Sequence, residues 1–287
     1  SCKFHFCKIG DENSAHLTKE FFVRERRKIF ITVKASPHPS KKHREIVCTA
    51  GIDSDGNFLR LYPFPFRMMD TEIQFSKYQW IEVDIEKSTR DPRPESYKAY
   101  PSTVVLGEKV SPKNWEERRR IVGQLEIDTL CGLKKNCKNT TKTLSIIKPK
   151  KVDDLIVKAT DRDWTGREKE YVRIISLLDQ SRPPLKKMPY EFKYKFSCEH
   201  PDCKGHEMKI GDWELTALYW NLIHGKESEE SALKKVKDKF LGELCSVKRD
   251  VHFFVGTHSS YQTWMIIGLF SPPRVASKKK TDQFSLL

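Results

Sequence analysis

Three residues of metal-binding type stand close together late in the chain, and they restrict how its C-terminal half can fold. Cys198, Cys203 and His206 are separated by four and by two residues. The segment also contains Pro201 and Gly205, which favour a tight loop. Thiolate and imidazole are the ligands that zinc prefers, and four of them close a structural zinc site. The spacing therefore predicts a structural metal site that orders this loop.

The sequence leaves the fourth ligand open, because residues of the same type occur elsewhere in the chain. The candidates are Cys131, Cys137, His200, Cys245 and His258. Cys131 and Cys137 would also form a four-thiolate set with Cys198 and Cys203, which suits zinc or an iron–sulfur cluster. His206 fits a closed zinc site, so zinc ranks above the iron–sulfur cluster.

The charge balance of the chain favours a polyanionic partner. Its 287 residues include 53 Lys and Arg against 39 Asp and Glu, which gives a net charge of +14. A surplus of this size promotes association with DNA, RNA or an anionic membrane. No apolar run has the length of a membrane span, and the N-terminal residues lack the apolar stretch of a secretory signal. We therefore expect a cytoplasmic protein with reduced cysteines that binds nucleic acid, DNA or RNA, and no membrane.

Alternating polarity and turn residues predict a β-rich unit early in the chain. Strands are expected at residues 28–34, 45–52, 58–62 and 78–87. The Asp55-Gly56 pair between the second and third of them is a strong hairpin signal, because glycine adopts positive φ without steric cost. Short strands at this spacing indicate a small barrel or a sandwich.

Capping signals predict helices in the middle and last parts of the chain. Ser111-Pro112 begins one helix, and the capping box from Thr165 to Glu168 begins another. Asp212 caps a third helix. The apolar stretches at 251–255 and 264–270 predict buried strands after it.

The segment Glu45–Arg67 (EIVCTAGIDSDGNFLRLYPFPFR), with the KYQWIEVDIEK and DPRPESYK stretches after it, resembles the dual-OB-type β-barrel module of prokaryotic conflict-system proteins. In that module a C-x-A-G strand leads to a W-I-R-P strand, an apolar strand and a P-E-N element. Cys48–Gly51 matches the first motif, Leu59–Leu61 has leucine where the proline would stand, and Pro94–Ser96 stands at the P-E-N position. The resemblance covers residues 28–110. It implies an OB-like fold that binds nucleic acid together with other proteins of an assembly for antiviral defence or in mobile elements.

These patterns together predict an α+β protein. An N-terminal OB-like small β-barrel is followed by a helical connector and a C-terminal α/β unit with a Cys/His zinc knuckle. The expected divisions are a basic arm at 1–27, an OB-like β domain at 28–110, a helical connector at 111–182, a zinc-stapled α/β domain at 183–273 and a basic tail at 274–287.

Cations alternate with aromatic residues around the predicted hairpin, and a nucleic-acid surface needs both, cations for phosphates and planar groups for bases. Tyr62 or Phe64 is expected to stack on bases, although a core position is an equal alternative for Phe64. The complete set of expected nucleic-acid contacts is Lys41, Lys42, Arg44, Arg60, Tyr62, Phe64, Arg67, Arg118 and Arg119.

The sequence carries weaker signals for two other functions. It contains no P-loop, no Gly-x-Gly-x-x-Gly, no Gly-x-Ser-x-Gly and no His-Glu-x-x-His motif. A metal-dependent nuclease is the first alternative, and its candidate catalytic residues are Glu82, Asp84 and Glu86 on one strand face, and Glu191 with Lys193 on another strand. We favour an exposed strand face paired with neighbouring cations for the first set. The second alternative is an adaptor that docks other proteins through the arm and the tail.

Overall fold

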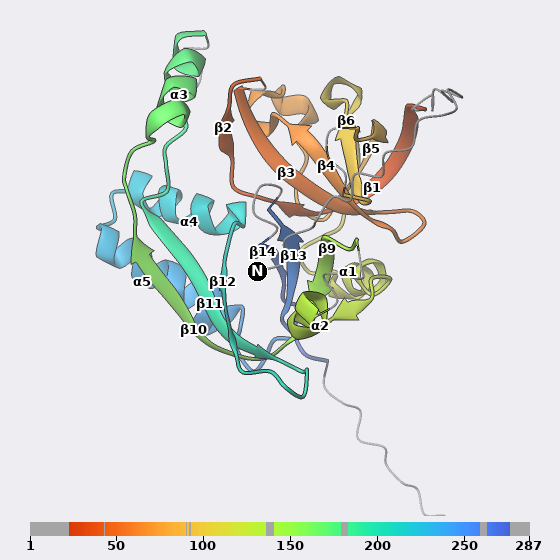
Figure 1. Ribbon diagram of the computed structural model, residues 1–287, viewed down its shortest axis with the longest axis vertical. Coiled ribbons are helices and arrows are strands. Elements are labelled where there is room, and N and C mark those ends of the chain that lie inside the picture. The colour runs from red at the N-terminus through yellow and green to blue at the C-terminus, as the bar shows by residue number, and fades with distance from the viewer. Residues whose placement is uncertain are drawn as a thin grey trace, which may run out of the picture.

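The structure is a computed structural model that describes residues 23–42, 44–89, 91, 93–135, 141–178, 183–258 and 263–275 (Figure 1). Most of the expected arm and tail, together with Cys137, lies outside the described residues. The fold is mixed α+β, with an N-terminal barrel and a later unit that contains most of the helices, as the sequence predicts.

The N-terminal strands form a closed five-stranded barrel. β1 (Glu25–Lys34) pairs with both β3 (Arg44–Asp53) and β5 (Gln79–Lys87), and β4 (Phe58–Phe64) pairs with β3. The barrel closes through β6 (Ser96–Ala99), which lies parallel to β4 and antiparallel to β5. The strand order β1-β3-β4-β6-β5, returning to β1, is that of a small Greek-key barrel of the OB type.

Local chemistry sets β1, β3, β4 and β5 where the sequence predicts strands, whereas β6, which closes the barrel, was not predicted. Ile81, Val83 and Ile85 alternate along β5 and are fully buried in the barrel core. The β3–β4 hairpin turns at Gly56, which has a φ of 85°. The Asp53 carboxylate accepts hydrogen bonds from the backbone N–H groups of Asp55 (3.0 Å) and Asn57 (2.8 Å), which fixes the turn. Two short strands flank the barrel, β2 (His38–Ser40) on β3 and β7 (Val105–Lys109) on β5.

The rest of the chain builds two further sheets and the helices around them. β10 (Pro149–Ala159), β11 (Tyr190–Cys198) and β12 (His206–Lys209) form one sheet, and β14 (Trp264–Phe270), β13 (His252–Thr257), β9 (Leu144–Ile147) and β8 (Ile127–Asp128) form the other. The helices are α1 (Trp115–Val122), α2 (Leu130–Lys135), α3 (Gly166–Leu178), α4 (Trp213–His224) and α5 (Glu229–Lys237), the last continuing into a π-helical turn at Asp238–Glu243. The expected helical connector therefore carries α1, α2 and α3, but also strands that pair with β11 and β13.

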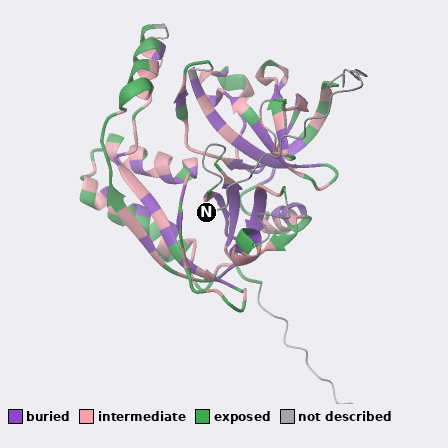
Figure 2. Cartoon of the chain, in the orientation of Figure 1, coloured by how far each residue is buried: buried purple, intermediate pink, exposed green. Residues whose placement is uncertain are grey.

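The barrel and the C-terminal unit share an apolar cluster. Phe30 and Ala50 of the barrel pack in it with Phe254 and Phe270 of the second unit. Figure 2 shows buried residues both in the barrel strands and in β13 and β14 next to them. Within the described residues, no helix has the combination of length and apolar character needed to cross a membrane.

The contact between β1 and β3 leaves no room for a side chain at Gly51. A Cβ at this position would lie 2.6 Å from Ile29 Cγ2 and 2.6 Å from the Phe30 carbonyl oxygen. We expect Gly51→Ala to lower the free energy of unfolding by about 1–3 kcal/mol, because the backbone has to shift to relieve this clash. Urea unfolding measures the change. Gly242→Ala is the control, since no atom lies within 4 Å of its new methyl group. Equal stability of Gly51→Ala and the wild type would contradict the close packing of β1 on β3.

Candidate metal centre and nucleic-acid interface

A cleft with a volume of about 2130 Å³ opens between the barrel and the C-terminal unit. Its barrel wall is made by β3 and β4, by the segment after β1 and by the segment after β5; Cys48, Tyr62, His38 and Asp91 represent these four parts. The far wall, opposite the barrel, comes from α4, from β11 and from the segment between α3 and β11. Small-molecule sites have volumes of roughly 300–1,000 Å³, so this cleft has room for an extended ligand.

The cleft lies over the face by which OB barrels bind oligonucleotides and oligosaccharides. That face is formed by the second and third barrel strands and by the loops that follow the first and fourth strands. Here the second and third barrel strands are β3 and β4, and the two loops span 35–43 and 88–95. The described residues of both loops and the exposed side of both strands contribute to the wall of the cleft.

The lining of the cleft includes several basic and aromatic side chains. The basic residues outnumber the acidic ones, which are Glu86, Asp91 and Glu191, so the lining has a positive balance. The basic residues are Lys42, Arg60, Arg67, Arg93, Lys98, Lys142, Lys186, Lys187 and Lys209. The tyrosines and tryptophans are Tyr62, Trp164, Tyr190, Trp213, Trp220 and Trp264.

Four of the nucleic-acid contacts expected from the sequence line this cleft, namely Lys42, Arg60, Tyr62 and Arg67. Lys42 and Tyr62 line it, and Tyr62 is 39% exposed. Arg67 lines it as well, and its guanidinium donates to the Glu45 carboxylate (3.1 Å) and to the Pro183 carbonyl oxygen (2.8 Å). The backbone of Arg44 belongs to β3, but its side chain lies outside the described residues. Lys41 is exposed next to Lys42.

Arg60 also lines the cleft but is almost completely buried, with 2% of its surface exposed. Its guanidinium donates to the hydroxyl groups of Ser96 (3.3 Å) and Thr143 (3.1 Å) and to the Thr143 carbonyl oxygen (2.9 Å). Arg60 therefore joins the barrel to the segment before β9, and only a small part of it faces a ligand.

The remaining expected contacts lie away from the cleft. Phe64 is fully buried in the barrel core, which is the alternative that the sequence left open for it. Arg118 is 5% exposed, donates to the Val110 carbonyl oxygen (2.9 Å) and lies over the Tyr78 ring. Arg119 pairs with Asp250 and donates to the Pro273 carbonyl oxygen. Both arginines of α1 thus have partners within the protein.

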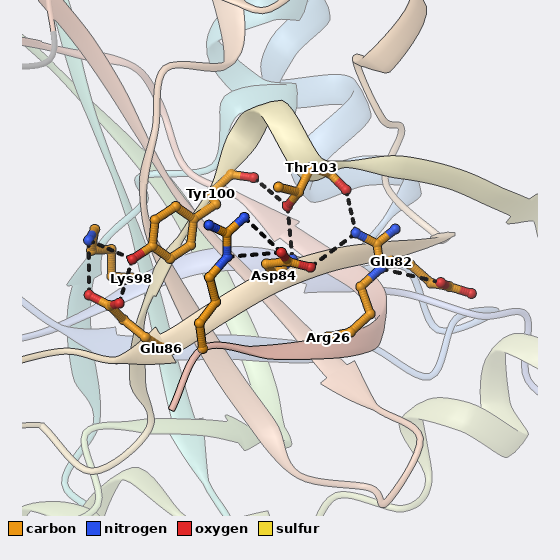
Figure 3. A network of polar contacts seen from close by, with 8 residues as sticks. Arg26, Glu82, Asp84, Glu86, Lys98, Tyr100 and Thr103 are labelled. Atoms are coloured by element: carbon orange, nitrogen blue, oxygen red, sulfur yellow. Dashed lines mark hydrogen bonds and ion pairs between the residues drawn. The ribbon is translucent and has the colours of Figure 1, made fainter. Parts of the chain in front are cut away.

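The carboxylates on the outer face of β5 are paired with cations (Figure 3). Asp84 accepts hydrogen bonds from Arg26 (3.1 Å) and Arg24 (2.9 Å), and these bonds lower the pKa of its carboxyl group. Glu82 lies 3.5 Å from Arg26. Glu86 accepts hydrogen bonds from the Tyr100 hydroxyl group and from Lys98, and the pKa of Glu86 is lowered in consequence.

The other candidate catalytic pair is also engaged by cations. The Glu191 carboxylate lies 3.2 Å from the Lys193 ammonium and 2.9 Å from that of Lys209. These bonds, with that to Lys209 the stronger, lower the pKa of Glu191. Among the residues that the structure describes, the one group of ligands close enough to hold a metal ion does not include either carboxylate set.

That group consists of Cys131, Cys198, Cys203 and His206, whose ligand atoms all lie within 4.8 Å of one another. Cys198 ends β11 and His206 begins β12, and these strands pair with each other, so the hairpin brings the two together. Cys203 stands in the connecting loop, where Gly205 has a φ of 93°. Cys131 comes from α2, which Leu130 and Leu133 anchor in the C-terminal core.

The distances between these ligands fit a tetrahedral metal ion. His206 Nε2 lies 3.4 Å from the sulfur of Cys131, 3.5 Å from that of Cys198 and 3.3 Å from that of Cys203. Metal bonds of about 2.3 Å to sulfur and 2.0–2.1 Å to nitrogen at tetrahedral angles separate the two ligand atoms by about 3.5 Å. The position of His206 relative to the three thiol groups therefore suits one metal ion shared by all four residues.

The ionisation behaviour of the ligands differs within the group. Burial and the nearby thiol groups of Cys198 and Cys203 raise the pKa of Cys131 to about 12. Burial also acts against ionisation of Cys203, but hydrogen bonds from the backbone at Cys198 and Gly205 outweigh it and lower the pKa of Cys203. Burial, with a contribution from Lys134, lowers the pKa of His206, which keeps its imidazole neutral and able to bind a metal.

Three other candidates for the fourth ligand lie elsewhere. The Cys245 thiol donates to the Phe240 carbonyl oxygen (3.2 Å) in the C-terminal core. His258 lines the cleft, and His200 accepts a hydrogen bond from the backbone N–H of Asp202 (3.2 Å). Cys137 belongs to the part of the chain that the structure does not describe.

Comparison with known proteins gives a family for the chain. The model of a family described as a domain of unknown function (DUF8757) matches residues 126–286. The chain belongs to this family. The DUF8757 region contains all four metal-binding residues, and a second domain of unknown function (DUF8758) matches residues 25–124, which include the barrel. No curated protein matches the chain.

Solved structures give only distant similarities. A structure of a murine DNA-binding protein bound to double-stranded DNA aligns with 90% of this chain and 100% of its own, at 11% identity and a TM-score of 0.29. A replication protein A heterotrimer bound to single-stranded DNA aligns with 88% of this chain and 66% of its own, at 9% identity and a TM-score of 0.23. Scores this low do not establish a shared fold.

Sequence reasoning missed most of the far wall of the cleft. Trp213 and Trp220 stand seven residues apart on α4, a spacing that places them on one helix face. The segment 183–188 (PPLKKM) combines prolines with two lysines and lines the cleft, although no contact was predicted for it from the sequence. Both signals were available in the sequence, but neither indicates which surface it faces.

The metal centre can be tested by replacing Cys131, the ligand that is most distant from the other three in the sequence. We expect Cys131→Ser to lose bound metal as fully as Cys198→Ser, because the site needs all four ligands to close. Metal analysis of the purified protein measures the stoichiometry, with one ion per chain expected for the wild type. Cys245→Ser is the matched control, since its thiol lies outside the group, and it should keep its metal. Full metal content in Cys131→Ser would exclude this ligand set.

Proposed function

We propose that the protein binds nucleic acid in the cleft between its barrel and its C-terminal unit. The observation that carries this proposal is the position of the cleft, which covers β3, β4 and the loops on either side of them. This is the ligand face of an OB barrel. A fold by itself does not assign a function, so the proposal depends equally on the residues that line the face.

The lining suits a single strand. Lys42 and Arg67 stand on the barrel side and Lys186 on the far side, so a phosphate backbone meets cations on both walls. Tyr62 and the four tryptophans offer planar groups on which unpaired bases can stack. In a duplex the bases are stacked on one another, and these aromatic rings would have no partner.

We also propose that the bound metal is zinc and that it has a structural role. Three thiolates and one imidazole in a tetrahedral arrangement are a common structural zinc set. The four ligands would fill the coordination sphere and leave no open position for a substrate. The metal would fasten α2 to the β11–β12 hairpin, and Tyr190 at the other end of β11 lines the cleft.

The resemblance of residues 28–110 to conflict-system modules extends the proposal to a nucleoprotein assembly for antiviral defence. Its support is the sequence likeness around Cys48–Gly51 together with the barrel topology. Co-purification of the tagged protein from its own cells with nucleic acid and a stoichiometric protein partner would support it, whereas isolation without such a partner would exclude the assembly.

Binding is tested by fluorescence anisotropy with labelled single- and double-stranded DNA and RNA over a series of salt concentrations. We expect a single strand to bind more tightly than the duplex of the same sequence. Lys42→Ala should weaken the binding of all sequences alike and reduce the salt slope by about 0.7, the value for one phosphate contact on a single strand. Lys113→Ala, which removes an exposed lysine outside the cleft, should leave the slope unchanged.

Stacking on the barrel is tested at Tyr62. We expect Tyr62→Ala to weaken the binding of a single strand by about 1–3 kcal/mol, the contribution of one stacked base, while Tyr62→Phe retains the ring and most of the affinity. The same titrations with single-stranded DNA measure both variants. Equal affinities for Tyr62→Ala and the wild type would show that the strand does not use this face of the barrel.

A further inference from the structure

A second, smaller pocket opens beside the cleft and shares part of its wall. It lies between the loop at 161–164, helix α3 and the segment 185–187, and its volume is about 390 Å³. Trp164, Lys186 and Trp220 line both this side pocket and the cleft, so the two spaces are neighbours. The volume is at the lower end of the roughly 300–1,000 Å³ that small-molecule sites occupy, which suits one nucleotide rather than a stretch of strand.

The side pocket combines planar rings with cations. Trp164 and Trp220 contribute the rings, and Lys169, Lys186 and Lys187 contribute ammonium groups. The Lys186 ammonium lies 5.3 Å from the centre of the Trp220 ring. Within the described part of the chain, no carboxylate forms an ion pair with Lys169 or Lys186. These two charges are therefore available to an anionic ligand.

The pocket is held in place without a ligand. The Trp164 indole N–H donates to the Leu185 carbonyl oxygen (2.8 Å), and Lys187 donates to the Asp163 carbonyl oxygen (3.2 Å), so two hydrogen bonds join its two loops. Arg162, whose side chain reaches Glu229 in two hydrogen bonds of 2.5 and 2.7 Å, fixes the first loop on α5. A preformed site of this kind loses little conformational freedom on binding.

We propose that the side pocket binds one nucleotide of the strand that occupies the cleft. Its base stacks on Trp164, and a phosphate next to that base is bound by Lys169 and Lys186. The inference rests on the proposed function, because the strand in the cleft delivers this nucleotide. It adds a site that binds one base of the strand apart from the bases that lie in the cleft.

The experiment uses the full chain and the shortest single-stranded DNA that still binds with full affinity. Each base of this oligonucleotide is replaced in turn by an abasic site, and affinities are measured by anisotropy for the wild type and for Trp164→Ala. We expect Trp164→Ala to lower the affinity about 5- to 150-fold, which corresponds to the loss of one stacked base. One abasic position should cause a similar loss in the wild type and no further loss in Trp164→Ala, because both changes remove the same contact.

Two additional variants separate binding from folding. Trp164→Phe keeps an aromatic ring and should retain most of the affinity. Lys169→Ala removes an exposed side chain, which leaves the fold intact, and should weaken binding and reduce the salt slope, whereas Lys113→Ala outside both pockets should not. If the wild type binds the strand but Trp164→Ala and Lys169→Ala bind it equally well, the side pocket is excluded and the proposed function stands. If the wild type binds no single strand, both the side pocket and the proposed function are excluded.

Discussion

The barrel and the C-terminal unit, which form the two walls of the cleft, are joined by an ionic contact of the buried Lys77 as well as by their shared apolar cluster. Lys77, in the segment before β5, places its ammonium 2.7 Å from the Glu214 carboxylate and 2.9 Å from the Leu269 carbonyl oxygen. Burial alone would lower the pKa of Lys77, but its polar surroundings, including Glu214 and Asp212, outweigh burial and raise it, so the charge persists. A paired charge at such a junction resists separation, because pulling the two units apart would leave Asp212 and Lys77 without their partners. The two walls of the cleft are therefore fixed relative to each other.

The far wall depends in turn on the metal group. β11 contributes Tyr190 and Glu191 to the cleft at its beginning and Cys198 to the metal group at its end. A metal ion bound to this group would clamp one end of the hairpin to α2 and hold its register on β10, which positions the cleft residues at the other end. The metal group and the cleft are thus linked through β11, although no residue belongs to both.

The sequence predicts the barrel well because barrel strands are specified locally. Alternation along β5 and the Asp53–Asn57 turn require only neighbours in sequence. The metal group was predicted to three ligands out of four for the same reason, since those three stand within one hairpin. The fourth, Cys131, lies 75 residues from His206 and reaches it through the packing of α2, which no spacing rule expresses. The far wall of the cleft was not predicted either, because Trp164 and Trp220 are distant in the sequence and meet only in the folded chain.

Arg60 shows why charge in a sequence overestimates the cations available to a ligand. It stands among aromatic residues in a motif that predicts nucleic-acid contact, and the fold does place it in the wall of the cleft. Its guanidinium, however, donates to Ser96 within the barrel and to Thr143 before β9, and so joins the barrel to that segment. Arg118 and Arg119 are likewise occupied with partners within the protein. In the proposed function, the net charge of +14 attracts a polyanion over a distance, and the affinity comes from a small number of cleft cations together with the aromatic rings between them.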